Sequence, residues 1–214
     1  ELTVMLLVDV SNSLDFGTVK QLKRDMVTEI SATLAFSAIQ NNDKIGVIFF
    51  SDKIEKFIPP KKGRKHILYI IRELIDFKPE STRTNIQCAI EYLTNVQKKR
   101  CTAFMLSDFI DDHDFQNALT VANRKHDVVA LQVYDRRMEE LPDVGLLKLR
   151  DAETGHEQWV DTSSRAVRNA HHAWWMQRQE KLNGIFTHSN VDSVSVRTDQ
   201  DYVKALLNLF AKRN

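Results

Sequence analysis

The stretch LTVMLLVDVSNS, residues 2–13, joins an almost continuously apolar run to a polar tip. A run of this kind predicts a strand that is covered on both faces, as in a parallel sheet. Asp9 lies near its end, and two serines, Ser11 and Ser13, follow at alternate positions. Because open parallel sheets bind ligands beyond the carboxyl ends of their strands, we expect a binding site at this tip.

Helix-like and strand-like segments alternate along the rest of the chain. Apolar spacing and cap residues predict helices over residues 19–40, 64–77, 85–98, about 113–125, from a cap at Thr162 or Ser163 to about 183, and from a cap at Thr198 or Asp199 through Phe210. Further strands are predicted over residues 45–50, 102–108, 127–135 and 191–198. The alternation predicts an α/β fold with a doubly wound, mostly parallel sheet and helices on both faces.

One predicted strand runs the other way. The segment SDKIEKFIP, residues 51–59, follows the strand over 45–50 so closely that it must return antiparallel to it. Pro59 and Pro60 lack backbone donors, so we expect them to end this strand and place it at an edge of the sheet.

We expect residues 1–214 to form a single domain. Residues 145–161 predict a β-hairpin insertion with its turn near Glu153 to Gly155. A strand follows Glu1 almost at once, which leads us to expect a fragment of a longer protein that lacks an upstream segment.

Composition excludes several classes of protein. The 214 residues are 43% hydrophobic and 28% charged, as in ordinary soluble domains. A net charge of +1 gives no reason to expect nucleic acid or an anionic membrane as a partner. No apolar run approaches the roughly 20 residues that span a bilayer. Two cysteines, Cys88 and Cys101, match no zinc spacing and are expected to be buried or half-buried thiols.

Three polar segments are predicted to meet at one rim of the sheet. Besides the tip of the first strand, Asp108 closes the strand over 102–108, and Thr84 lies in the loop before the helix that leads into that strand. Their carboxylates and hydroxyls are hard oxygen ligands, which favour Mg²⁺ or Mn²⁺ over zinc or copper. The expected metal ligands are Asp9, Ser11, Ser13, Thr84 and Asp108. This set leaves one position open for a carboxylate from another molecule.

Each of these segments also has a plainer interpretation. Asp and Ser are favoured at helix N-caps, which would account for Asp9 and Asp108 singly.

In HHAWW, residues 171–175, the adjacent histidines are expected to be packing residues of a helix, with Trp174 on its apolar side and Trp175 exposed.

The polar segments together resemble a known site. Asp9-Val-Ser11-Asn-Ser13, Thr84-Asn85 and Ser107-Asp108 match the metal-ion-dependent adhesion site of von Willebrand factor type A (VWA) domains. The longer segments DVSNSLDFGT, DKIGVIFFSDKIEKFIPPKKGRKHIL, LSDFIDD and LRDAETG resemble the bacterial proteins called domain of unknown function 58. The resemblance implies a Rossmann-like, three-layer α/β/α fold.

The resemblance also implies a function. Such a protein would be a non-enzymatic interaction module that binds a Glu or Asp carboxylate of a protein partner through Mg²⁺. A MoxR-type AAA+ ATPase is implied as the partner, in protein maturation or complex assembly. The implied location is the cytoplasm, with or without a membrane tether in the missing upstream segment.

The competing hypothesis is a Mg²⁺-dependent phosphohydrolase or nuclease that uses Asp9 and Asp108. Phosphatases of the haloacid dehalogenase type also use a first-strand aspartate, but they require Asp-x-Asp, and here Ser11 stands in place of the second acid. The chain also has no Gly-rich phosphate loop and no GxSxG nucleophile elbow. These features favour the module over the enzyme.

Overall fold

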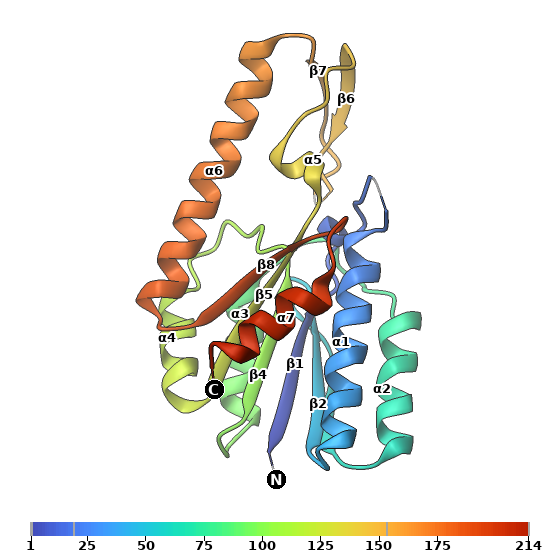
Figure 1. The fold of residues 1–214 in the computed structure, drawn as a ribbon, viewed down its shortest axis with the longest axis vertical. Helices are drawn as coiled ribbons and strands as arrows, with labels where there is room; N and C mark the ends of the chain where they lie inside the picture. The colour runs from blue at the N-terminus through green and yellow to red at the C-terminus, as the bar shows by residue number, and fades with distance from the viewer. Residues whose placement is uncertain (1, 19, 153, 214) are drawn as a thin grey trace.

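A twisted six-stranded sheet forms the centre of the computed structural model, which describes residues 2–18, 20–152 and 154–213 (Figure 1). The strand order is β3-β2-β1-β4-β5-β8. The strands are β1 (Thr3–Asp9), β2 (Lys44–Phe50), β3 (Ile54–Lys61), β4 (Thr102–Ser107), β5 (Asp127–Tyr134) and β8 (Asp192–Arg197). All neighbours pair in parallel except β2 and β3, which are antiparallel. The predicted mostly parallel sheet with one antiparallel edge strand is confirmed.

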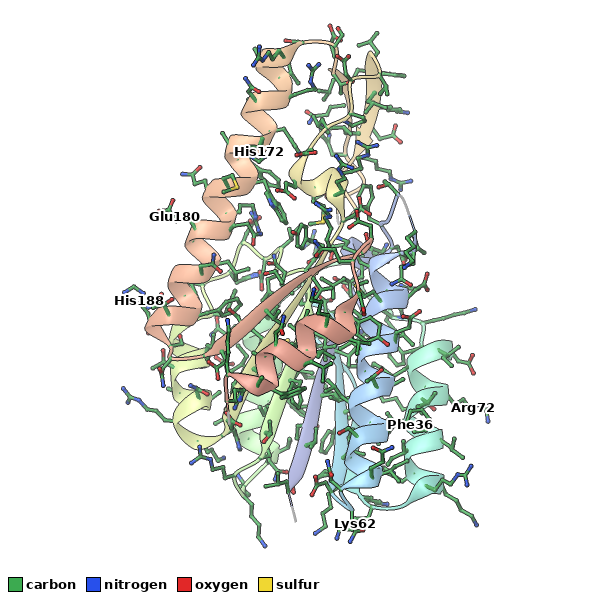
Figure 2. All side chains as sticks on the ribbon, viewed as in Figure 1. Phe36, Lys62, Arg72, His172, Glu180 and His188 are labelled. Atoms are coloured by element: carbon green, nitrogen blue, oxygen red, sulfur yellow. The ribbon has the colours of Figure 1, made fainter. Side chains whose placement is uncertain are left out.

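Helices cover both faces of this sheet, as predicted. One face carries α1 (Lys23–Gln40), α2 (Arg64–Asp76) and α7 (Tyr202–Ala211), and the other carries α3 (Ile86–Val96), α4 (Gln116–Lys125) and α6 (Arg165–His188) (Figure 1). In β1, Leu6 packs into the first core and Leu7 into the second, because side chains alternate across a strand. Figure 2 shows how side chains fill the layers between the sheet and the helices.

A smaller lobe extends beyond the carboxyl ends of the strands. It contains α5 (Arg136–Glu139) and a two-stranded antiparallel sheet of β6 (Leu146–Arg150) and β7 (Glu157–Asp161), beside the first half of α6 (Figure 1). The hairpin predicted over residues 145–161 is therefore present, although Glu153 in its expected turn lies outside the described residues.

Several element boundaries differ from the sequence-based prediction. The first long helix begins at Lys23 instead of residue 19; Val19 itself lies outside the described residues. Pro59 and Pro60 do not end β3 but lie within it. The pairing with β2 shifts register between Ile58 and Lys61, so a bulge at the sheet edge accommodates the missing backbone donors.

The caps of the last two long helices were also misplaced. The N-cap of α6 is Ser164, and the helix continues to His188. The N-cap of α7 is Asp201, whose side chain accepts a hydrogen bond from the backbone N–H of Val203. Asp199 lies two residues before this cap, and its carboxylate pairs with Arg197 at 2.6 Å.

The prediction for the two tryptophans of α6 was wrong. Trp175 is buried against Tyr134, with ring centroids 5.3 Å apart, whereas Trp174 is 44% exposed. α6 extends past the end of β5 into the smaller lobe. Where it passes the end of β5, the side of the helix that packs inward is the one that faces Tyr134. The cysteine prediction is confirmed, since Cys88 is half-buried and Cys101 buried, both as free thiols.

Candidate metal centre

The ends of β1 and β4 lie side by side at the point where the strand order reverses. β1 pairs with β2 on one side and with β4 on the other, and the chain places its later strands beyond β4. Asp9 is the last residue of β1 and Ser107 the last of β4. Such a reversal leaves a crevice beyond the strand ends, which is the usual ligand site of open α/β sheets.

Asp9 is held in this crevice by two hydrogen bonds. Its Oδ1 accepts from the backbone N–H of Ser11 at 2.9 Å, and its Oδ2 accepts from the hydroxyl of Ser107 at 2.5 Å. The hydroxyls of Ser11 and Ser13 lie 3.0 Å apart. The carboxylate and the two hydroxyls predicted from the Asp-x-Ser-x-Ser pattern thus share one buried cluster with Ser107.

Asp108 directly follows β4 and lies beside the cluster. Its Oδ1 accepts from the backbone N–H of Ile110 at 3.1 Å and its Oδ2 from the ammonium of Lys23 at 2.6 Å. Burial, and next the negative charge of Asp108, raise the pKa of Asp9 to about 7, although bonds from Ser107 and Ser11 oppose the shift. The two carboxylates are therefore close enough to interact electrostatically.

Thr84 comes from the third segment. It is buried and immediately precedes Asn85, whose side chain caps α3 by accepting from the backbone N–H of Cys88. The backbone N–H of Asn12 donates to the carbonyl of Thr82 at 3.2 Å. This bond holds the loop that carries Thr84 against the segment between Ser11 and Ser13.

Lys23 is the residue that sequence reasoning missed. It is only 2% exposed, and its ammonium also contacts the sulfur of Met138 at 3.3 Å and lies 5.8 Å from the centre of the Phe16 ring. Nothing in the local sequence marks it, since lysine side chains are ordinarily exposed. In the structure Leu22 is 38% exposed because it precedes α1 as its N-cap, whereas Met26 and Ile30 within the helix are buried.

The donor set fits a hard divalent cation that is bound by few charged ligands. Each oxygen of Asp9 and Asp108 already accepts one hydrogen bond and retains lone-pair capacity. Oxygen donors of this type suit Mg²⁺ or Mn²⁺ and not soft metals. Among the described residues, no group of three or more His, Cys, Asp or Glu side chains could hold a metal, so any site here depends on hydroxyls as well as acids.

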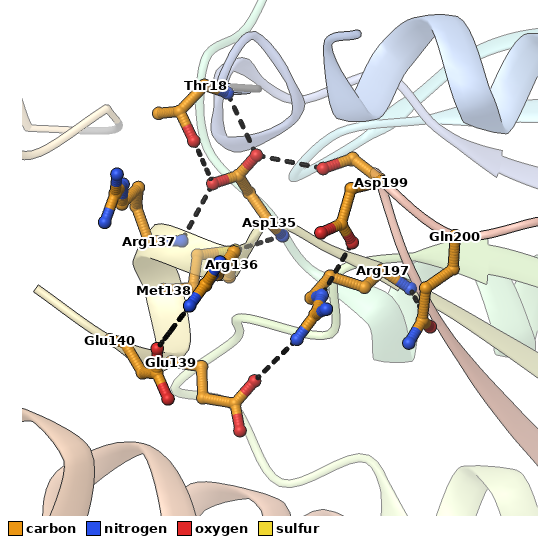
Figure 3. A network of polar contacts seen from close by, with 11 residues as sticks. Thr18, Asp135, Arg136, Arg137, Met138, Glu139, Glu140, Arg197, Asp199 and Gln200 are labelled. Atoms are coloured by element: carbon orange, nitrogen blue, oxygen red, sulfur yellow. Dashed lines mark hydrogen bonds and ion pairs between the residues drawn. The ribbon is translucent and has the colours of Figure 1, made fainter. Parts of the chain in front are cut away.

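Another buried carboxylate, that of Asp135, fixes the loops beside the cluster (Figure 3). Asp135 follows β5 and accepts from the backbone N–H and hydroxyl of Thr18 at 2.9 and 2.7 Å, from the N–H of Arg137 at 2.8 Å, and from the hydroxyl of Thr198 at 2.9 Å. Burial alone would raise the pKa of Asp135, but these bonds outweigh it and lower the pKa. Asp135 thereby ties the segment leading to Lys23 to the ends of β5 and β8. The sequence could have indicated Asp135, because it comes at the end of a buried strand, as Asp9 and Asp108 do.

The family described as "Protein of unknown function DUF58" matches residues 1–181. The chain belongs to the DUF58 family. Uncharacterized proteins of Mycobacterium tuberculosis (strain H37Rv) and Mycobacterium bovis are each 30% identical to this DUF58 chain over 220 residues. The alignment covers all of the DUF58 chain and 68% of each mycobacterial protein.

Solved structures show the fold. BatB from Bacteroides thetaiotaomicron aligns with a TM-score of 0.65 at 18% identity over 99% of the DUF58 chain and 98% of BatB. An aerotolerance-related membrane protein from Bacteroides fragilis aligns with a TM-score of 0.67 at 18% identity over 99% and 100% of the two chains. The VWA domain of SpRpn10 aligns with a TM-score of 0.52 at 11% identity over 99% and 94%.

The predicted family and the VWA-like fold are therefore confirmed. In the part of the chain that the structure describes, no helix combines the length and apolarity needed to cross a membrane.

Proposed function

We propose that this DUF58 chain is a non-catalytic module that captures a Glu or Asp carboxylate of a partner protein through Mg²⁺ or Mn²⁺. Asp9, Ser11, Ser13, Thr84 and Asp108 would hold the cation, directly or through water. The observation that carries the proposal is the buried cluster at the adjacent ends of β1 and β4, which contains the Asp9 carboxylate, the hydroxyls of Ser11 and Ser13 and the Asp108 carboxylate.

Lys23 supports the capture of an anion. With both carboxylates ionised, the ammonium that pairs with Asp108 leaves the side chains with one net negative charge. A divalent cation bound there would supply an electrophilic centre with one net positive charge. A partner's carboxylate would neutralise that charge, and a buried site strongly favours such neutrality because unpaired charges are costly away from water.

The same cluster argues against hydrolysis. Ser11 occupies the position where a phosphohydrolase of the Asp-x-Asp type carries its proton donor, and its hydroxyl is bound to Ser13. The hydroxyl of Ser11 would be a much weaker general acid than a carboxylic acid, since its pKa is far from neutral. Asp9 is also constrained on both oxygens, which suits a ligand held in place.

For the partner, the family resemblance points to a MoxR-type AAA+ ATPase, with the pair acting in protein maturation or complex assembly. The carboxylate that completes the metal shell would then come from the ATPase or from a protein it remodels. A pull-down of such an ATPase by the DUF58 chain should succeed in Mg²⁺ and fail in EDTA, and should fail with Asp9→Ala.

Metal binding is the direct test. MgCl₂ and MnCl₂ should each raise the Tm, because a ligand specific to the folded state stabilises it. Asp9→Ala should remove the shift and Ser13→Ala should reduce it. Asp76→Ala is the matched control, because this carboxylate lies on α2 and is 68% exposed.

Calorimetric titrations in sodium acetate and in sodium chloride test the carboxylate. Acetate should increase the affinity for Mg²⁺. An unchanged Tm at millimolar metal, or equal metal affinity in Asp9→Ala, would overturn the proposal. Phosphate-ester hydrolysis that survives repurification and is lost in Asp9→Ala would favour the enzyme instead.

A further inference from the structure

A cleft of about 500 Å³ lies between the candidate metal centre and the smaller lobe. This volume lies within the range of about 300–1,000 Å³ that is typical of ligand pockets. Its lining comes from the strand-end rim, the start of α1, α5, the hairpin and α6. In that order it includes Ser13 and Phe16, Lys23, Arg137, Arg150 and Trp174. The cleft therefore begins at a proposed metal ligand and continues away from it along the lobe.

Two guanidinium groups in this cleft have no charge partner among the residues that the structure describes. Lys23 is paired with Asp108, and Arg178 lies 3.7 Å from Asp112 and over the ring of Trp174. By contrast, the guanidinium groups of Arg137 and Arg150 make no ion pair or hydrogen bond within residues 2–18, 20–152 and 154–213. Figure 3 shows the side chain of Arg137 extending away from Asp135. Arg137 contacts Asp135 through its backbone N–H alone. Guanidinium groups bind carboxylates in a bidentate geometry.

Aromatic side chains add an apolar surface. Phe16 on the rim is 40% exposed and Trp174 on α6 is 44% exposed, although both are large hydrophobic residues. Exposed aromatic and arginine side chains that line one concave surface are the residue types that dominate protein-interface energies. An anion binding to the arginines alone would leave these rings in water.

We propose that this cleft binds an acidic segment of the partner protein, with one carboxylate at the metal centre, a further carboxylate on Arg137 or Arg150, and an apolar side chain against Phe16 and Trp174. This inference rests on the proposed function, because it describes the same partner. The occupant follows from charge complementarity. The lining also holds three aspartates, Asp111, Asp112 and Asp151, against four basic side chains, so its side chains carry one net positive charge. Two of those basic groups, Arg137 and Arg150, have no charge partner among the described residues, and beside a carboxylate-binding cation they favour an acidic chain.

A displayed library of random 12-residue peptides tests the proposal without knowledge of the partner. The probe is the peptide most enriched on the wild-type chain in MgCl₂, synthesised with a fluorophore and titrated by anisotropy. We expect enriched peptides to contain two or more acidic residues and an apolar residue. Arg137→Gln with Arg150→Gln should weaken binding about tenfold or more, the loss expected for a charge-assisted hydrogen bond.

The control is Arg64→Gln with Arg72→Gln on α2, far from the lobe (Figure 2 shows Arg72). It removes the same charge and should leave affinity unchanged. Because neither cleft arginine has a charge partner in the described chain, the cleft variant should keep the wild-type Tm.

The outcomes separate the two proposals. Peptides that require Mg²⁺ and Asp9 but bind the Arg137→Gln, Arg150→Gln variant normally would overturn the cleft and leave the proposed function standing. Peptides that require the arginines but neither Mg²⁺ nor Asp9 would support the cleft and overturn metal-mediated capture. No enrichment, or enrichment without acidic residues, would overturn the cleft. A dimer that the cleft variant dissociates would assign the surface to a second copy of the chain and also overturn it.

Discussion

The ammonium of Lys23 lies 2.6 Å from Oδ2 of Asp108, and the two side chains are 2% and 0% exposed. These residues are separated by 85 positions in the chain, yet they form an almost completely buried ion pair at the candidate metal centre. Lys23 thus places a fixed positive charge beside a proposed metal ligand.

Lys23→Met should have two opposite effects. Without metal it should destabilise the fold by about 3 kcal/mol, because Asp108 is left as an unpaired buried charge near Asp9. Its affinity for Mg²⁺ should rise about tenfold or more, because a repelling charge is removed. Urea unfolding and calorimetric titration measure the two effects, with Lys20→Met, an exposed lysine just before α1, as the control. Unchanged Mg²⁺ affinity would show that Lys23 does not influence the cation.

The raised pKa of Asp9 predicts a specific pH dependence. Its folded pKa is about 7, well above the value of 3.8 for a free aspartate, so the folded state binds the proton more tightly than the unfolded state. The contribution of Asp9 to stability without metal is therefore present in acid and is lost as pH rises from about 4 to 7, with a slope of at most about 1.4 kcal/mol per pH unit. Subtracting the unfolding free energies of Asp9→Asn from those of the wild type at each pH isolates this slope. A flat difference between pH 5 and 7 would refute the raised pKa.

Affinity for Mg²⁺ should depend on pH in the opposite direction. Asp9 must lose its proton to bind a cation, so the proton competes with metal below pH 7. The apparent Kd should weaken up to about tenfold per pH unit below 7 and level off above it. Titrations at pH 6, 7 and 8 measure the effect, and a Kd that is the same at all three would contradict it.

Asp135 should be a stability residue. Asp135→Ala would leave the backbone N–H of Thr18, the N–H of Arg137 and the buried hydroxyl of Thr198 without their shared acceptor. We expect a loss of about 3 kcal/mol or more in the free energy of unfolding. Hydrogen exchange should also speed up in the segment between Thr18 and Lys23. Asp199→Ala, at a 22% exposed carboxylate, is the comparison and should cost much less.

The two neighbouring tryptophans should differ sharply. Trp175→Ala should destabilise by about 3–5 kcal/mol, because it opens a cavity beside Tyr134. Trp174→Ala should cost far less, because that side chain is 44% exposed. Chemical denaturation of both variants tests this assignment, and equal or reversed costs would contradict the observed orientation of α6.

The elements predicted well are those with strong local signals. The apolar run of β1, the short return into β3 and the hairpin of β6 and β7 each follow from residue spacing within a few positions. The polar ends of β1 and β4 were also visible, because parallel strands bring their carboxyl ends to one edge. Local spacing did not predict the burial of Lys23 or Trp175, because each packs against residues that are distant in the chain, Asp108 and Tyr134 respectively.

The sequence by itself therefore determined the alternating architecture, the oxygen-rich chemistry at the strand ends and the family to which the chain belongs. Only the tertiary structure decided that Lys23 pairs with Asp108 and that Ser107 donates to Asp9. It alone also decided that two arginines without a charge partner in the described part of the chain share a cleft with the strand-end rim. The physical reason is the distance along the chain over which each interaction acts. Hydrophobic periodicity depends on neighbouring residues, whereas the partner of a buried charge depends on how segments far apart in the chain pack together.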